Sequence, residues 1–249
     1  MLVHIAVTGD DEALLRAMQT TFEGYPVRVS PLRKDATPIP LTTGIVTAPE
    51  TALTLLEPCL ALARFESNLF RLLAQAIDAH EGLPPTAHVE MLDVALGFAE
   101  FLEMSPQERQ YLELSVLFHD LGKIRVPAEV FVCKTLLSAE EWEQVRRHAE
   151  WGAEMLEAQG FPCEVSAVVR HHHESYDGTG YPEGLEGEAI PRLARILRII
   201  DVYTAITTPR KYRRSVSTKA EAIEQLQTED ARSFDPVLVS KFVSYLTLR

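Results

Sequence analysis

The sequence predicts a mainly helical protein preceded by a small α/β module at the N-terminus. From about residue 50 onward the apolar side chains follow the helical period, and no convincing pair of strands interrupts them. Within residues 1–50, by contrast, short β-leaning apolar runs alternate with one helical segment. We therefore expect two units, a small α/β module of regulatory type at residues 1–55 and an all-α unit at residues 56–249.

The predicted N-terminal module reads as strand, helix, strand and a further strand. LVHIAV and YPVRVSPL are apolar, β-leaning runs on either side of the helical segment EALLRAMQTTF, and TGIVTA follows a proline-bearing stretch. Asp10 and Asp11, directly after the first run, resemble the acidic pair of a response-regulator receiver. No aspartate follows GIVTA, where a phosphoacceptor would stand. We therefore interpret the two acids as solvated turn residues.

Helix starts in the larger unit carry explicit capping signals. Ser105, Ser138 and Thr218 are each followed three residues later by glutamate, which is the capping-box pattern. A proline directly after Ser105 suits the first helical position, where its missing N–H is not needed. Asp235 and Pro236 open a last predicted helix, PVLVSKFVSYL. These signals predict four helix N-termini from local sequence alone.

Charge and hydropathy exclude several functional classes. The formal net charge is −12, which disfavours broad binding to nucleic-acid polymers or anionic membranes. No run approaches the 18 uninterrupted apolar residues of a membrane helix, and the N-terminus lacks the positive region of a signal peptide. The three cysteines are scattered and form no CxxC pair. We expect a cytoplasmic protein with no membrane or nucleic-acid polymer as partner.

A set of histidines and aspartates stands within apolar helical stretches or at their ends. Its members are His88, His119, Asp120, His148, His172, His173 and Asp201. Burying such groups without partners would be costly, whereas a shared divalent cation would satisfy them together. Imidazole with carboxylate suits iron, manganese, nickel or zinc. A single His-Asp pair is more often a capped, solvated pair, so the metal prediction depends on the whole ordered set.

Four longer motifs occur in order along the larger unit. They are HDLGKIRVP, HHESYDGTGYPEGL, IPRLARILRIIDVYTAITTPRKYR and SFDPVLV. Together they resemble the signatures of the HD-GYP family, a branch of the HD phosphohydrolase superfamily, over roughly residues 65–249. The resemblance implies an HD-type helical bundle that hydrolyses cyclic di-GMP to the linear dinucleotide in bacterial second-messenger signalling. Whether hydrolysis continues to GMP stays open.

The resemblance also implies a metal centre with two divalent ions, iron or manganese first, with nickel, zinc or magnesium as alternatives. One ion would be held by His88, His119, Asp120 and Asp201. The other would be held by Asp120, His148, His172 and His173. Asp120 would therefore bridge the two ions and is, with Lys123, the residue expected to act in catalysis. Family members with a third metal carry a glutamate four residues before the first histidine, where this chain has Pro84.

Substrate contacts follow from the same resemblance. Lys123 would contact the scissile phosphate, and one helical turn from His119 it can face the same site. Arg210 and Arg213 would contact the substrate phosphates, a task that suits the guanidinium group. The turn residues Gly180, Tyr181 and Pro182 would shape the substrate edge.

Partner proteins and a non-enzymatic alternative also follow from the resemblance. The glycine-rich loop that contains Gly180 and Tyr181 would serve as the surface for a diguanylate-cyclase (GGDEF) partner, and a homodimer is a further candidate assembly. An HD phosphohydrolase acting on another nucleotide is a second enzymatic hypothesis. A third hypothesis is a catalytically weak module that acts as a cyclic di-GMP effector or protein-interaction domain. The complete set of candidate metal ligands disfavours this last hypothesis.

Overall fold

The computed structural model describes strands at 3–7, 27–31 and 44–46 and then residues 67–84, 86–132, 137–208, 216–228 and 232–249. The chain divides into two compact units, Met1–Leu69 and Phe70–Arg249. The boundary predicted at residues 55 and 56 lies outside the described residues. It therefore stays a prediction.

The first unit contains a three-stranded parallel sheet in the order β2-β1-β3. The strands are β1 (Val3–Val7), β2 (Val27–Pro31) and β3 (Gly44–Val46). Val3 pairs with Val27, and Ile5 pairs with Gly44. Each strand falls within one of the three β-leaning runs of the sequence. The helix predicted between the first two strands lies outside the described residues, so the α/β module itself remains a prediction.

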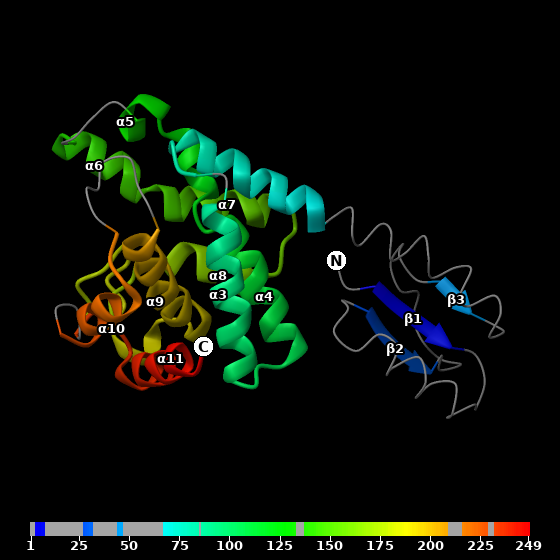
Figure 1. Ribbon diagram of the computed structural model, residues 1–249. Helices are drawn as coiled ribbons and strands as arrows, with labels where there is room; N and C mark the ends of the chain where they lie inside the picture. Colours follow the sequence, from blue (N-terminus) through cyan, green and yellow to red (C-terminus); the bar gives the residue numbers. More distant parts are fainter. Residues whose placement is uncertain are drawn as a thin grey trace. The chain divides into compact units, whose positions relative to one another are not determined.

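The second unit is helical, as the periodicity predicted (Figure 1). The helix at 67–80, most of which belongs to this unit, comes first. The following elements are α3 (Ala87–Phe101), α4 (Pro106–Phe118), η1 (Leu121–Arg125), α5 (Ala128–Val132), α6 (Ala139–Arg146), α7 (His148–Ala158), α8 (Cys163–His171), η2 (Gly187–Ala189), α9 (Arg192–Thr207), α10 (Lys219–Thr228) and α11 (Pro236–Leu248). The predicted mainly-α class is confirmed for this unit.

The predicted capping signals are present at all four helix starts. Ser105 accepts the amide hydrogen of Glu108, whose carboxylate accepts the Ser105 amide in return. The same reciprocal arrangement starts α6 at Ser138 and precedes α10 at Thr218. The Asp235 carboxylate accepts two backbone amides of α11. Local hydrogen bonding therefore sets where these helices begin.

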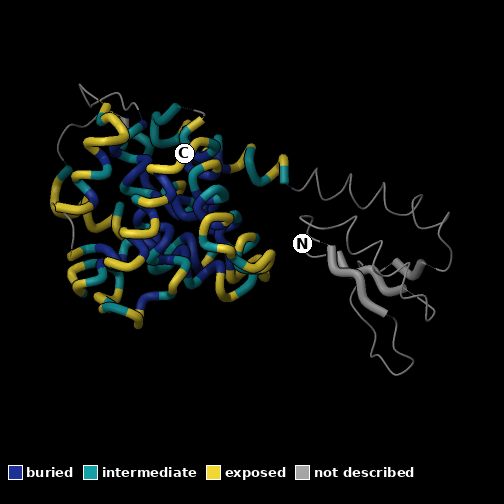
Figure 2. The backbone as a smooth tube through the Cα atoms, turned by 60° about the horizontal axis from the view of Figure 1, so that its bottom comes forward, coloured by how far each residue is buried: buried dark blue, intermediate teal, exposed yellow. Residues whose placement is uncertain are grey.

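One hydrophobic core joins the helices of the second unit. α3 packs on α4 and α9, and α8 packs on α4, α7 and α9. Phe98, Leu112, Ile196 and Phe242 are among the largest fully buried side chains. In Figure 2 the buried backbone lies inside this unit and the exposed backbone surrounds it. The core fixes the relative positions of the helix ends that carry the histidines.

Close backbone contact joins η1 to α7. A Cβ on Gly122 would lie 2.7 Å from the amide nitrogen of Gly152 and closer still to the carbonyl oxygen of His148. A glycine is therefore required at this position of the His-Asp motif, since any larger residue would push the two segments apart. This contact brings the residues before and after Gly122 next to the start of α7.

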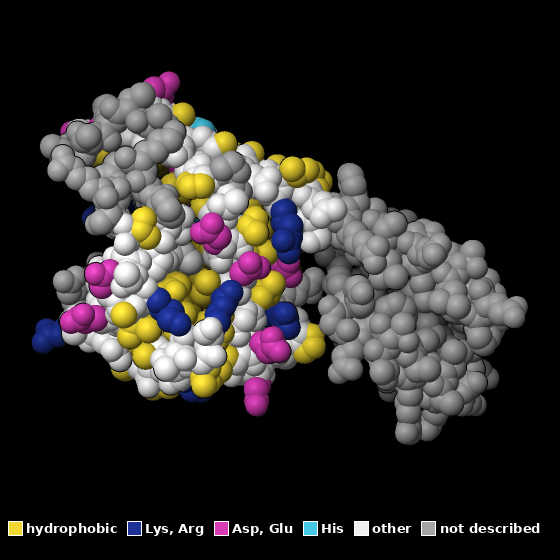
Figure 3. All heavy atoms as spheres, in the orientation of Figure 1, with side chains coloured by type: hydrophobic (Ala, Val, Ile, Leu, Met, Phe, Trp, Pro, Cys, Tyr) yellow, Lys and Arg dark blue, Asp and Glu magenta, His cyan; other side chains and the backbone are white. Residues whose placement is uncertain are grey.

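Lys and Arg side chains are interspersed with Asp and Glu on the face of the second unit shown in Figure 3. Among the described residues, no helix combines the length and the apolar character needed to cross a bilayer.

The cap at Ser105 provides a test of the helical boundaries. Ser105→Ala removes one side of the reciprocal cap and should lower the free energy of unfolding by about 1 kcal/mol. Urea denaturation followed by circular dichroism measures this loss. Ser240, which is exposed in the interior of α11, supplies the control: Ser240→Ala should change stability by less than about 0.5 kcal/mol. Equal losses in both variants would contradict a specific role for the cap.

Candidate metal centre

Three buried histidines share one hydrogen-bonding arrangement. His119, His148 and His172 each direct Nδ1 at the carbonyl oxygen of the residue three positions earlier, at 2.8, 2.5 and 2.6 Å. A carbonyl can only accept, so Nδ1 carries the proton in each ring. All three side chains are buried. The backbone therefore orients three imidazoles so that Nε2 faces into one shared space, as in histidines that bind metals.

His88 is oriented by a carboxylate instead. Its Nδ1 donates to Oδ1 of Asp78 at 2.5 Å, and its backbone amide donates to Oδ2 at 3.3 Å. Asp78 is fully buried, and His88 is 3% exposed. Nε2 of His88 is buried and has no hydrogen-bond partner among the described residues. A buried nitrogen that lacks a partner yet is held rigidly by its other side fits a metal ligand.

Asp120 lies between the histidines. Its Oδ2 is 3.1 Å from Nε2 of His119, and its Oδ1 is 3.3 Å from Nε2 of His148. Nε2 of His148 is also 3.3 Å from Nε2 of His172. The two oxygens of one carboxylate thus face two separate imidazole groups, as a bridging ligand requires.

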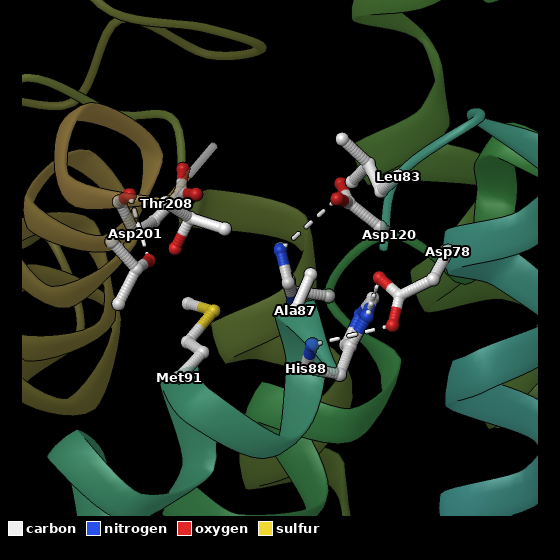
Figure 4. Close-up of a pocket in the computed structure, with 10 residues that line it drawn as sticks. Asp78, Leu83, Ala87, His88, Met91, Asp120, Asp201 and Thr208 are labelled. Carbon is white, nitrogen blue, oxygen red and sulfur yellow. Dashed lines mark hydrogen bonds and ion pairs between the residues drawn. The ribbon is translucent and has the colours of Figure 1, made fainter. Parts of the chain in front are cut away.

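The candidate ligand atoms fall into two groups that share Asp120. Asp120, His148, His172 and His173 form one group, and His88, His119 and Asp120 form the other; within each group the ligand atoms lie within 4.8 Å of one another. Asp201 is not in either group of described ligand atoms, but it lines the same pocket as His88, His119 and Asp120. In Figure 4 Asp78 is turned toward His88, and Asp120 and Asp201 lie on either side of the pocket. The pocket volume of about 30 Å³ has room for an ion and a water molecule.

The buried histidines differ in the direction in which their pKa values are shifted. Burial lowers the pKa of His148 to about 4 and holds the pKa of His172 and His173 well below the usual range. These rings are therefore neutral at pH 7, which is the form that binds metals. For His119, burial lowers the pKa, but the Asp120 carboxylate outweighs burial and raises the pKa to about 9.

Asp120 remains ionised despite its burial. Burial alone would raise the pKa of Asp120, yet the neighbouring positive charges of His119 and Lys123 hold it well below the usual range. A buried carboxylate that stays charged attracts cations strongly, because little solvent screens it. Asp120 is thus the centre of negative charge between the two ligand groups.

Lys123 belongs to the same cluster. Its Nζ donates to Oδ2 of Asp120 at 2.8 Å and to Oε2 of Glu81 at 2.7 Å. Burial lowers the pKa of Lys123, but the two carboxylates outweigh burial and hold the pKa above the usual range. Burial raises the pKa of Glu81 to about 7, although the Lys123 charge acts in the opposite direction. Lys123 therefore brings a permanent positive charge to the edge of the histidine cluster.

The glycine-rich loop after His173 is held by Glu174. The buried Glu174 carboxylate accepts the backbone amides of residues 183–185 at 2.8, 3.1 and 3.1 Å. A Cβ on Gly180 would lie 2.5 Å from the Cα of Glu174, so the loop can fold back on itself only with glycine there. Asp177 accepts the backbone and side-chain donors of Thr179. These contacts orient the loop rather than the ligand atoms.

Tyr181 connects this loop to the histidine cluster. Its ring stacks on the ring of His173 with centroids 4.8 Å apart and an interplanar angle of 27°. The guanidinium of Arg146 lies 5.4 Å from the Tyr181 ring centroid. The peptide bond between Tyr181 and Pro182 is cis. The loop predicted to shape the substrate edge is thus in direct contact with a candidate metal ligand.

Most of the predicted site residues meet in this region. Gly180, Tyr181 and Pro182 lie in the loop. All seven predicted metal ligands belong to the two ligand groups or line their pocket, and Lys123 donates to one of them, Asp120. Arg210 and Arg213 lie outside the described residues, so their substrate contacts stay predictions. His171 pairs with Glu183 instead of joining the cluster. His80 donates to the carbonyl of Val126, so it too has a structural contact.

The sequence reasoning missed two acidic residues. Asp78 orients His88, and Glu81 binds Lys123, yet both lie just before the first motif histidine in a segment that reads as an ordinary amphipathic helix end. One local signal was available for Asp78: it stands among apolar residues of the helical stretch RLLAQAIDAH. A carboxylate on an apolar face needs a partner.

Comparison with known proteins identifies relatives across most of the chain. The family model described as HD domain matches residues 66–238. The cyclic di-GMP phosphodiesterase response regulator RpfG of Xanthomonas campestris pv. campestris is 33% identical over 245 residues, which cover 94% of this chain and 65% of that protein. The cyclic di-GMP phosphodiesterase PA4108 of Pseudomonas aeruginosa is 37% identical over 156 residues, or 62% of this chain and 37% of that protein.

The chain thus spans between about a third and two thirds of the length of these relatives. Because 94% of the chain is covered, the match with RpfG extends into the unit Met1–Leu69. Among solved structures, the cyclic GMP-AMP specific phosphodiesterase V-cGAP3 of Vibrio cholerae has a TM-score of 0.57 at 22% identity, over 73% of this chain and 48% of that chain. That likeness shows a common helical fold.

The contact between Asp78 and His88 predicts a role in metal affinity. Asp78→Asn removes the charge that orients the imidazole and should weaken metal binding by about 10- to 100-fold. Titration of the metal-free protein against a competing chelator measures the affinity. Asp93→Asn is the matched control, because Asp93 is exposed on α3, the helix that carries His88. Unchanged affinity in the Asp78 variant would show that the backbone alone positions His88.

Proposed function

The chain belongs to the HD domain family, and from the geometry of its histidine cluster we propose that it hydrolyses cyclic di-GMP with the help of bound divalent metal ions. The resemblance to the HD-GYP motifs is confirmed at the level of the family by this match and by the cyclic di-GMP phosphodiesterases among the relatives. The observation that carries the proposal is the shared Asp120, whose two oxygens face separate groups of imidazoles.

The residues present fit divalent metal ions. The donor atoms are imidazole nitrogens and carboxylate oxygens, a mixture that suits iron, manganese, nickel or zinc. Two ions are proposed, one held by His88, His119, Asp120 and Asp201 and the other by Asp120, His148, His172 and His173. The buried Nε2 of His88, which has no partner among the described residues, supports the first of these sets. Iron or manganese is the proposed identity.

Bound divalent ions supply a Lewis acid for phosphate oxygens and lower the pKa of a coordinated water. The protein's own contribution is orientation and charge. Asp120 and the backbone carbonyls hold the imidazoles in one arrangement, so little reorganisation is needed when a phosphodiester arrives. The Lys123 ammonium complements the negative phosphate at the edge of the cluster. Hydrolysis itself adds one water across one P–O bond, leaving a phosphomonoester and a hydroxyl.

The loop at residues 174–185 supports a cyclic dinucleotide as the substrate class. The Tyr181 ring lies on His173, and the Arg146 guanidinium lies next to Tyr181, where a group of this kind can stack on a base. Arg210 and Arg213 are proposed as further phosphate contacts. The same loop is the proposed surface for a diguanylate-cyclase partner, with a homodimer as a further proposed assembly.

Regulation is proposed to come from residues 1–55. Three parallel strands are the described part of this unit. The match with RpfG, a response regulator, extends into the unit and supports a regulatory role. The proposed site of action is the cytoplasm.

Turnover of cyclic di-GMP by anaerobically purified protein, with the metal content assayed on the same sample, tests the proposed function. We expect the linear dinucleotide as product and about two metal ions per chain. A parallel assay with 3'3'-cGAMP tests the substrate, since the metal cluster alone would serve any phosphodiester. Faster turnover of cGAMP would reject cyclic di-GMP as the substrate. Bound metal and bound cyclic di-GMP without turnover would instead support the effector function.

Asp120 and Lys123 should have separable effects. Asp120→Ala removes the shared carboxylate and should abolish both metal binding and turnover. Lys123→Ala should retain the metal and lose about 10²-fold in turnover, the range typical for one preorganised electrostatic group. Metal analysis and initial rates on the same preparations distinguish the two. Full metal content with full turnover in the Asp120 variant would reject the bridging role, and loss of metal in the Lys123 variant would reject the role of the lysine.

A further inference from the structure

The Lys123 ammonium is held by two carboxylates from separate segments. Asp120 contributes one contact at 2.8 Å, and Glu81, directly after the helix at 67–80, contributes the other at 2.7 Å. The side chain of Lys123 is 15% exposed and that of Glu81 is 7% exposed. Glu81 is not a member of either candidate ligand group. Its contact with the cluster is therefore made through Lys123.

Lys123 retains a free donor in this arrangement. An ammonium carries three N–H groups. Asp120 and Glu81 accept two of them, and among the residues that the structure describes no other acceptor binds Nζ. The ring of Phe131 lies 6.0 Å from Nζ. The third N–H is thus available for a phosphate oxygen of the substrate.

The burial of Glu81 lowers the stability of the fold, which an exposed ion pair with a purely structural role would not do. Oε1 of Glu81 is buried and has no hydrogen-bond partner within the described ranges. Leaving a carboxylate oxygen desolvated and unpaired is unfavourable for folding. An ion pair that merely tied two segments together could stand in solvent, as the pair between Arg125 of η1 and Glu154 of α7 does, with side chains 46% and 54% exposed. Because the unpaired Oε1 of Glu81 lowers the stability of the fold, the presence of this carboxylate points to a functional role in the site.

Asp120 cannot orient Lys123 by itself. The Oδ2 atom that accepts from Lys123 also faces Nε2 of His119 at 3.1 Å, and Asp120 is the shared candidate metal ligand. A lysine side chain is a flexible four-carbon stem with a point charge at its end. A second contact from a different direction is required to restrict where that charge lies.

We propose that Glu81 is a positioning residue, which holds the Lys123 ammonium so that its third N–H meets the phosphate undergoing hydrolysis. The inference deepens the proposed phosphodiesterase function and rests on it. Glu81 acts on the substrate through Lys123 and contributes nothing to metal binding. Loss of the Glu81 charge therefore affects the reaction only while Lys123 is present.

A double-mutant cycle of Glu81→Gln and Lys123→Ala tests this dependence. Rates are measured with the metal-loaded full chain on cyclic di-GMP and on bis(p-nitrophenyl) phosphate, a phosphodiester without nucleobases. We expect Glu81→Gln to lower kcat by about tenfold, with metal content and KM for the second substrate little changed. In the Lys123→Ala background the same substitution should have no further effect. Glu81→Asp, which keeps the charge, should recover part of the lost rate.

The control is Glu154→Gln, which removes a carboxylate from the exposed ion pair between α7 and η1 and should leave kcat unchanged. A further tenfold loss from Glu81→Gln in the Lys123→Ala background would overturn the proposal, because it would show a structural role independent of the lysine. Loss of metal in Glu81→Gln would also overturn it. If Glu81→Gln misfolds, the cycle is measured with Glu81→Asp, and a loss of rate from Glu81→Asp that persists in the Lys123→Ala background would overturn the proposal. If the wild-type protein hydrolyses only bis(p-nitrophenyl) phosphate, cyclic di-GMP is rejected as the substrate, and the role of Glu81 is tested with bis(p-nitrophenyl) phosphate alone. No turnover of either substrate would reject both proposals.

Discussion

The rest of this site depends on the contacts that the Asp120 carboxylate makes with its neighbours. Asp120 is 7% exposed, and its two oxygens face His119 on one side and His148 on the other. A carboxylate so buried is tolerated only where positive charge compensates it from more than one direction. Lys123 supplies one such charge, and the arrangement of neutral imidazoles around the other oxygen provides ligands for a cation. The packing of α7 against η1 and α8 brings Asp120 next to the histidines of these helices.

The scaffold achieves that convergence with backbone contacts rather than with long side chains. Three histidines are oriented by the backbone carbonyl three residues earlier. His119 and His172 donate to carbonyls of α4 and α8, which end just before them, and His148 donates to a carbonyl of α6. Gly122 then allows η1 to approach α7 more closely than any residue with a side chain would permit. Since the helices pack in one core, the imidazole nitrogens are already in position before a metal ion or a substrate binds. Such preorganisation is what separates an efficient electrostatic site from a mere collection of suitable residues.

The edge of the site is built differently from its centre. The loop after His173 depends on one buried carboxylate, Glu174, which gathers three consecutive backbone amides. Tyr181 then lies on the ring of His173 and joins the loop to the cluster. Substrate-facing parts of a protein are more often carried by loops on a rigid scaffold than by the scaffold itself. The site thus combines a centre fixed by the helical core with an edge shaped by a loop.

The sequence by itself determined the helical class of the larger unit, the starts of four helices and the ordered set of histidines and aspartates. Each of these is encoded locally: a cap such as Ser105 with Glu108 needs only neighbouring residues, and the motifs are contiguous. The tertiary structure decided which carboxylates serve those motifs. Glu81 bears no local mark that separates it from a solvated acid, and the apolar neighbours of Asp78 show that it needs a partner without showing which one. Their partners, His88 and Lys123, stand ten and 42 residues further along the chain. Contacts over such separations depend on how the helices pack, which the core decides and no local pattern encodes.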